Sequence, residues 1–221
     1  MNDKYEGKGK SIYENGEYYI GQWKNNLRHG KGILYYSNGN ILYDGEFINN
    51  KFEGYGKCIW ENGIYYIGQW KNNLRHGKGI LYYSNGNILY DGKFINDKYE
   101  RNGKYIWENG EFYIGKWKKN LKQGKGILYY SNGNIKYDGE WIDDKYEGRG
   151  IFYYSNGNIK YEGEFINGKY EGNGKEIFED DGYFIGEYKN GLRNGKGIIY
   201  YYSNGNIKYD GEFINNEFVG N

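Results

Sequence analysis

The sequence predicts an all-β fold, a single-layer, elongated and twisted antiparallel meander of tandem β-hairpins. Three observations support it: the composition, a repeated aromatic–glycine element, and regularly spaced turn signals. The chain of 221 residues has no Ala, Thr or Pro, but it has 38 Gly and 30 Tyr. Glycine weakens helix interiors and the best helix former is missing, whereas Tyr, Phe, Trp and Ile favour strands.

The first repeated element is an aromatic residue, any residue, Gly, any residue and a second aromatic residue. Copies recur about every 24 residues, a spacing typical of repeat architectures. The nine copies begin at Tyr19, Tyr43, Tyr66, Tyr90, Tyr113, Tyr137, Tyr161, Phe184 and Tyr209.

A second element, Gly-x-Gly, follows each aromatic element, as in Gly30 and Gly32, and Arg101 replaces its first glycine once. Two repeat types alternate, one reading WKNNLRHGKGILYYSNGN and the other FINNKFEGYGKCIWENG. Residues 19–47 and 66–94 are nearly identical copies. Such copies predict one structural unit per period.

Each repeat ends in Asn-Gly or Asp-Gly, which predicts a two-residue type I′ hairpin turn. The other connection, Lys24 to His29, is interpreted as a six-residue loop. Two connections per repeat give two antiparallel strands per repeat. Alternation then places Tyr19, Gly21 and Trp23 on one face, together with Gly30 and Gly32 of the partner strand.

That face combines glycines with aromatic rings, and a glycine leaves bare backbone on which a neighbouring ring can lie flat. Glu176 occupies an otherwise apolar position of the same face and is not explained by the pattern.

These elements resemble the MORN repeat (membrane occupation and recognition nexus), and Tyr19 to Gly39, YIGQWKNNLRHGKGILYYSNG, fits its pattern throughout. The resemblance covers residues 1–221 as one continuous array, with a leading half-repeat at 4–18 and repeats starting near 19, 43, 66, 90, 113, 137, 161, 184 and 209. It implies a groove-forming sheet that mediates protein–protein or protein–membrane contact and has no catalytic residues of its own.

Composition excludes several function classes. The 30 basic and 29 acidic residues nearly cancel, so no field attracts nucleic acid. The single cysteine, Cys58, excludes an internal disulfide, and the first residues show no secretory signal. We expect a cytoplasmic protein, with cytoskeletal or peripheral-membrane association as alternatives, and no cofactor.

No catalytic or metal site is predicted. His29 and His76 occupy equivalent positions, and the matching residues in later copies, Gln123 and Asn194, cannot transfer protons. Cys58 replaces Ser11 and Tyr105 of sister repeats, which favours a packing role over a nucleophile.

The aromatic–glycine face has two interpretations: a structural core, or a groove that receives a protein partner. The second hypothesis assigns the groove to Tyr19, Trp23, Tyr66, Trp70, Tyr113, Trp117, Tyr137 and Trp141.

The basic residues of the first repeat type also have two interpretations, a solvated edge or an anionic-lipid site. The lipid hypothesis assigns Lys24, Arg28, Lys71, Arg75, Lys118, Lys122 and Arg193. The leading prediction is a non-catalytic protein–protein interaction scaffold, self-associating as a homo-oligomer through open sheet edges. The alternative is an anionic-phospholipid-binding module of a larger enzyme, such as a lipid kinase or an exchange factor.

Overall fold

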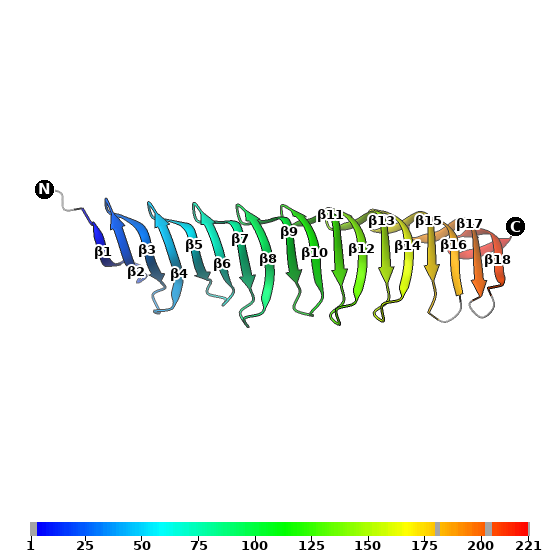
Figure 1. The fold of residues 1–221 in the computed structure, drawn as a ribbon, viewed down its shortest axis with the longest axis horizontal. Coiled ribbons are helices and arrows are strands. Elements are labelled where there is room, and N and C mark those ends of the chain that lie inside the picture. Colours follow the sequence, from blue (N-terminus) through cyan, green and yellow to red (C-terminus); the bar gives the residue numbers. More distant parts are fainter. Residues whose placement is uncertain (1–3, 180–181, 202–204, 221) are drawn as a thin grey trace. The chain divides into compact units, whose positions relative to one another are not determined.

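The protein is described here from a computed structural model that covers residues 4–179, 182–201 and 205–220. Strands follow one another in chain order as one open antiparallel meander, and no helix occurs in these ranges (Figure 1). The predicted single-layer, all-β antiparallel fold is therefore confirmed. The chain divides into two compact units, residues 1–106 and 107–221, which are described separately.

The strands have six to nine residues in unit 1 and four to ten residues in unit 2. Unit 1 contains β1 (Gly7–Ile12), β2 (Tyr18–Lys24), β3 (Leu27–Tyr35), β4 (Ile41–Ile48), β5 (Lys51–Ile59), β6 (Tyr65–Lys71), β7 (Leu74–Tyr82), β8 (Ile88–Ile95) and β9 (Lys98–Ile106). Unit 2 contains β10 (Phe112–Lys118), β11 (Leu121–Tyr129), β12 (Ile135–Ile142), β13 (Lys145–Tyr153), β14 (Ile159–Ile166), β15 (Lys169–Ile177), β16 (Gly182–Lys189), β17 (Leu192–Tyr201), β18 (Ile207–Ile214) and β19 (Glu217–Gly220).

Glycines pair with glycines across every strand boundary inside unit 1. Gly21 of β2 lies opposite Gly32 of β3, which lies opposite Gly45 of β4, which lies opposite Gly56 of β5. The same pairing continues to Gly103 of β9. The middle glycine of the first element and the second glycine of Gly-x-Gly therefore form one row, the glycine row.

Tyrosine rings cover the glycine row. A Cβ added at Gly21 or at Gly32 would run into the ring of Tyr19, so this ring occupies the space that both glycines leave. The Tyr19 side chain is 0% exposed, and its hydroxyl donates a hydrogen bond of 3.0 Å to the carbonyl oxygen of Gln22. The predicted arrangement of ring on bare backbone is confirmed, and it forms the core of the sheet.

The turn prediction was wrong in both places. In the Asn15-Gly16 pair, only the glycine has a positive φ, of 83°. The Gly16 N–H donates a hydrogen bond to the carbonyl of Tyr13. This is a three-residue turn closed by a left-handed glycine, in which Asn15 Oδ1 instead accepts a bond from the Glu17 N–H. The type I′ geometry lies in the other connection: β2 ends at Lys24 and β3 begins at Leu27, and Asn25 and Asn26 have φ of 50° and 66°. The interpreted six-residue loop is a two-residue turn.

The first glycine of Gly-x-Gly also differs from the prediction. Gly54 has a φ of 64°, and a Cβ there would meet Glu46, a polar residue outside the aromatic face. The pairing of β4 with β5 shifts register at this point, between Gly45 and Glu46. A β-bulge therefore interrupts the alternation, and left-handed backbone explains the glycine. Arg101 occupies the same left-handed conformation, with a φ of 60°.

The two-residue turns also bind the preceding repeat. The Asn50 N–H donates to the carbonyl of Arg28 at 3.0 Å, and the Arg28 N–H donates back to Asn50 Oδ1 at 2.8 Å. Asn73 and Phe52 make the same exchange. Asparagine suits this position for two reasons: it tolerates positive φ, and its side chain accepts a hydrogen bond from the backbone N–H of the preceding repeat.

Candidate binding groove

The eight residues predicted to contact a partner form the core of their units. The four tyrosines, Tyr19, Tyr66, Tyr113 and Tyr137, are 0% exposed. The tryptophans Trp70, Trp117 and Trp141 are buried, and Trp23 alone is partly exposed. The assigned tyrosines thus offer no surface for contact, and a partner would meet the side chains that cover them.

In the first repeat type, a cation covers the buried rings. In unit 1, the Arg28 guanidinium carbon lies 5.8 Å from the centre of the Tyr19 ring and 5.3 Å from that of Phe47. Arg75 lies at 5.9 Å from Tyr66 and 5.2 Å from Phe94. In unit 2, Lys122 and Arg193 take the same position. Cations over ring faces within about 6 Å are attracted by the ring quadrupole.

In the second repeat type, an aromatic ring takes the place of the cation. Phe52 in unit 1 stacks on Tyr43 with ring centres 3.8 Å apart and planes 6° apart. In unit 2, Tyr170 stacks on Tyr161 at 3.6 Å and 5°. Cations and rings therefore alternate along unit 1 in the order Arg28, Phe52, Arg75 and Tyr99.

A cavity of about 460 Å³ opens above this layer in unit 1. We call it the binding groove and define it by Phe52, Trp60, Trp70, Arg75 and Asp97, which line it together with Cys58 and Leu81. Phe52 and Trp60 are partly exposed, so they present ring surface to the cavity. The Arg75 guanidinium carbon lies 5.6 Å from the centre of the Trp60 ring, and Arg75 Nε donates to Asp97 Oδ1 at 2.9 Å.

The seven residues assigned to an anionic lipid do not share one surface. Lys24, Lys71 and Lys118 are exposed at strand ends, directly beside the two-residue turns. Arg28, Arg75, Lys122 and Arg193 are not loop residues, because they lie in strands β3, β7, β11 and β17 and cover buried rings. Their position in strands contradicts the six-residue loop interpretation, and lipid binding stays a prediction.

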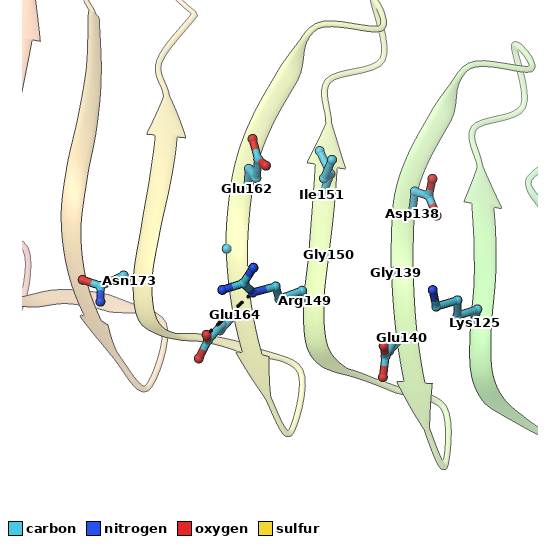
Figure 2. A pocket seen from close by; sticks show the side chains of 11 residues that line it. Lys125, Asp138, Gly139, Glu140, Arg149, Gly150, Ile151, Glu162, Glu164 and Asn173 are labelled. Carbon is cyan, nitrogen blue, oxygen red and sulfur yellow. Dashed lines mark ion pairs between the residues drawn. The ribbon is translucent and has the colours of Figure 1, made fainter.

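The opposite face of the sheet carries charged residues. In unit 2 a cavity of about 520 Å³ is lined by Asp138, Glu140, Arg149, Glu162 and Glu164. Figure 2 shows Arg149 directed toward Glu164, and the ion pair measures 3.9 Å between two exposed side chains. Such exposed pairs contribute little to stability. Within the described ranges, no group of three or more His, Cys, Asp or Glu residues could hold a metal ion.

The surroundings of Cys58, His29 and His76 indicate structural rather than chemical roles. Cys58 is 3% exposed, and burial raises the pKa of its thiol to about 12, so it is protonated at neutral pH. Reactive cysteines have lowered pKa values instead. His29 and His76 lie in equivalent positions of β3 and β7, and Nδ1 of each is buried without a hydrogen-bond partner in the described structure.

Sequence reasoning missed the alternating layer of cations and rings. The signal was available, because Arg28 follows Tyr19 by nine residues, just as Phe52 follows Tyr43. The six-residue loop interpretation concealed it, since that loop placed Arg28 away from the sheet.

No helix in the described residues is long and apolar enough to cross a membrane. A comparison with curated proteins gives no match. The family model of the MORN repeat matches ten segments: residues 1–18, 19–41, 43–65, 66–88, 90–112, 113–135, 137–159, 161–183, 184–206 and 209–221. MORN repeats form a module that is typically non-catalytic and generally linked to membrane or protein interaction. With matches along nearly its whole length, the chain belongs to the MORN repeat family.

Proposed function

We propose that this chain is a non-catalytic protein-interaction scaffold whose binding groove receives a segment of another protein. The carrying observation is the cavity in which partly exposed Phe52 and Trp60 flank Arg75. Aromatic rings and arginine are the side chains that most often dominate protein interfaces. A partner segment with apolar side chains would bury these rings, while Arg75 stays paired with Asp97.

Repetition supports a scaffolding role. The cation-over-ring arrangement recurs at Arg28 and Arg75 in unit 1 and at Lys122 and Arg193 in unit 2. Several weak contacts on one chain raise the effective concentration of a multivalent partner. The scaffold role therefore depends on repeated similar positions rather than on one deep site.

The test is selection of binding peptides from a random library on the purified chain, followed by affinity measurements on variants. Trp60→Ala removes groove surface, and Tyr55→Ala is the matched control, because Tyr55 is 60% exposed in the same unit and does not line the groove. We expect selected peptides to bind Trp60→Ala at least about tenfold more weakly, since buried aromatic anchors contribute about 2 kcal/mol or more. Peptides that depend on Tyr55 instead, or a library that yields no binder, would refute the proposal.

Anionic-phospholipid binding is the second candidate, and the exposed Lys24, Lys71 and Lys118 favour it. Lys24 and Lys71 of unit 1 lie at strand ends beside turns, and Lys118 has the equivalent place in unit 2. Reversal of all three to glutamate should abolish salt-sensitive binding to phosphatidylserine vesicles. Unchanged vesicle binding by that variant would exclude this surface.

A further inference from the structure

Two nearly identical repeats of unit 1 differ in the charge that faces their arginine. In the second copy, Arg75 has a carboxylate partner: Asp97 Oδ1 accepts bonds from both Arg75 Nε and the Arg75 N–H, each at 2.9 Å. In the first copy, Asn50 occupies the place of Asp97. Asn50 Oδ1 accepts a bond from the Arg28 N–H at 2.8 Å, and the Asn50 carbonyl accepts one from an Arg28 Nη at 3.0 Å.

The Arg28 side chain consequently donates to a neutral carbonyl, that of Asn50, and not to a carboxylate. No carboxylate lies within ion-pair distance of it among the described residues, where the recorded ion pairs involve Arg75, Lys122, Lys136 and Arg149. Its Nε is buried and has no hydrogen-bond acceptor. A buried donor without an acceptor is unfavourable, and a partly buried charge without a counter-ion is more so.

The surroundings of Arg28 are otherwise those of Arg75. The guanidinium carbon of Arg28 lies 5.9, 5.8 and 5.3 Å from the ring centres of Tyr13, Tyr19 and Phe47. The guanidinium carbon of Arg75 lies at nearly the same distances, 5.6, 5.9 and 5.2 Å, from the equivalent rings of Trp60, Tyr66 and Phe94. The aromatic frame is thus preserved while the counter-ion is absent. A ligand can supply at Arg28 the carboxylate that the chain itself supplies at Arg75, two repeats later.

Unit 2 contains the same contrast between two cation positions. Lys122 has an ion pair of 3.1 Å with Asp144, whereas Arg193 faces Asn216, whose Oδ1 accepts the Arg193 N–H at 2.9 Å. The turn residue therefore decides, in both units, whether the covering cation is neutralised within the chain.

We infer that Arg28 is a recognition position for a carboxylate side chain of a partner protein, and that Asn50 keeps this position open. The inference rests on the proposed function, since it names the chemistry that the array recognises. Asp97 closes the equivalent position at Arg75. A partner segment would place an Asp or Glu beside Arg28 and apolar side chains against the neighbouring rings of Tyr13 and Phe47.

The test uses the full chain and three peptides: acetyl-Ser-Leu-Glu-Leu-Ser-amide and the versions with Gln or phosphoserine in place of Glu. Binding is followed by NMR through the side-chain Nε–H signals of Arg28 and Arg75. These signals are assigned with Arg28→Lys and Arg75→Lys. The paired variants are Asn50→Asp, which supplies the missing carboxylate, and Asp97→Asn, which removes the existing one. Both exchange residues that sister repeats already contain.

We expect the Glu peptide to shift the Arg28 signal and to bind about two- to fivefold more tightly than the Gln peptide, the ratio expected for a partly exposed ion pair. Asn50→Asp should remove this preference at the Arg28 signal, and Asp97→Asn should create it at the Arg75 signal. Equal binding of Glu and Gln peptides at Arg28, persistence of the preference at Arg28 in Asn50→Asp, or tighter binding of the phosphoserine peptide there would each overturn the inference.

The outcomes separate this inference from the proposed function. If library peptides require Trp60 but the Glu and Gln peptides bind equally, the proposed interaction function stands and only the role of Arg28 is refuted. Absence of any Trp60-dependent peptide would refute the module itself.

Discussion

The hydroxyl of Tyr188 donates a hydrogen bond of 3.1 Å to Oε2 of Glu176 on the neighbouring strand. Each residue departs from its repeat pattern, because sister repeats have tryptophan or phenylalanine at the Tyr188 position and mostly apolar residues at the Glu176 position. In the repeats with tryptophan the indole donates to backbone instead, as Trp70 Nε1 does to the Gly56 carbonyl at 3.1 Å. The two departures thus compensate each other. Burial, together with the Glu176 carboxylate, raises the pKa of Tyr188, so its hydroxyl remains a donor across the neutral range.

This compensation predicts a strong coupling between the two positions. Glu176→Leu alone leaves the buried Tyr188 hydroxyl without its acceptor and should lower the free energy of unfolding by about 1–3 kcal/mol. Combination with Tyr188→Trp restores the sister pattern and should recover most of that loss. Urea denaturation of the single and double variants measures the coupling, and additive effects would show that the bond does not link the positions.

The contact between Tyr19 and Gly32 predicts a steric penalty for the smallest side chain. Gly32→Ala places a methyl group where the Tyr19 ring lies, so we expect a loss of about 1–3 kcal/mol in the free energy of unfolding. Lys31→Ala is the matched control, because Lys31 is exposed and adjacent in sequence. Thermal denaturation of both variants checks the prediction, and equal melting temperatures would contradict the ring-on-backbone core.

Arg101 predicts a stabilising substitution. It has a φ of 60° where every sister repeat has glycine, and a left-handed conformation costs an ordinary L-residue about 1–2 kcal/mol. Arg101→Gly should therefore raise the free energy of unfolding, by about 1 kcal/mol after the greater freedom of glycine in the unfolded chain is subtracted. Arg101→Lys keeps the strain and should leave stability unchanged. A destabilised glycine variant would mean that the Arg101 side chain makes a favourable contact.

The buried tyrosines predict a loss of stability at alkaline pH. Burial raises the pKa of Tyr19, Tyr99 and Tyr146 from 10.0 to about 12. Between these values the unfolded chain releases phenolic protons that the folded chain retains, so stability is fully present below pH 10 and falls as the pH rises toward 12. Circular dichroism and phenolate absorbance, recorded on one pH series, should change together. Phenolate absorbance of these tyrosines at pH 10 in folded protein would disprove their burial.

Sequence reasoning predicted the strands and the ring-on-glycine core, because both follow from local patterns. Tyr19, Gly21 and Trp23 alternate on one strand, and alternation is a direct consequence of pleated geometry. The same reasoning gave the wrong face or position for Gly54 and Arg28. A β-bulge inserts a residue near each of them and interrupts the alternation, without any change in composition that would mark it. The type I′ turn was assigned to the wrong connection for a similar reason. Asn-Gly and Asn-Asn both tolerate positive φ, and only the pairing of the flanking strands shows which of them forms the two-residue turn.

The contact between Arg28 and the turn residue Asn50 could not be predicted from the sequence, for a different reason. Arg28 and Asn50 lie 22 positions apart and meet only because a turn binds back onto the preceding repeat. No local pattern encodes that return contact. The difference between Asn50 and Asp97 was visible in the sequence, but its meaning required the arginine to be placed beside it.

The glycine row has a consequence for how such a chain can evolve. Each ring rests on backbone supplied by its own strand and the next one, so no packing contact of the core requires a residue far along the chain. A duplicated repeat of two strands brings its own glycines and its own tyrosine, and it fits between existing copies without any compensating mutation. Each such insertion adds two strand spacings, about 9.5 Å, to the sheet. Gene duplication can therefore adjust the length of the protein in fixed steps, while point mutations at turn positions such as Asn50 change the recognition chemistry one repeat at a time.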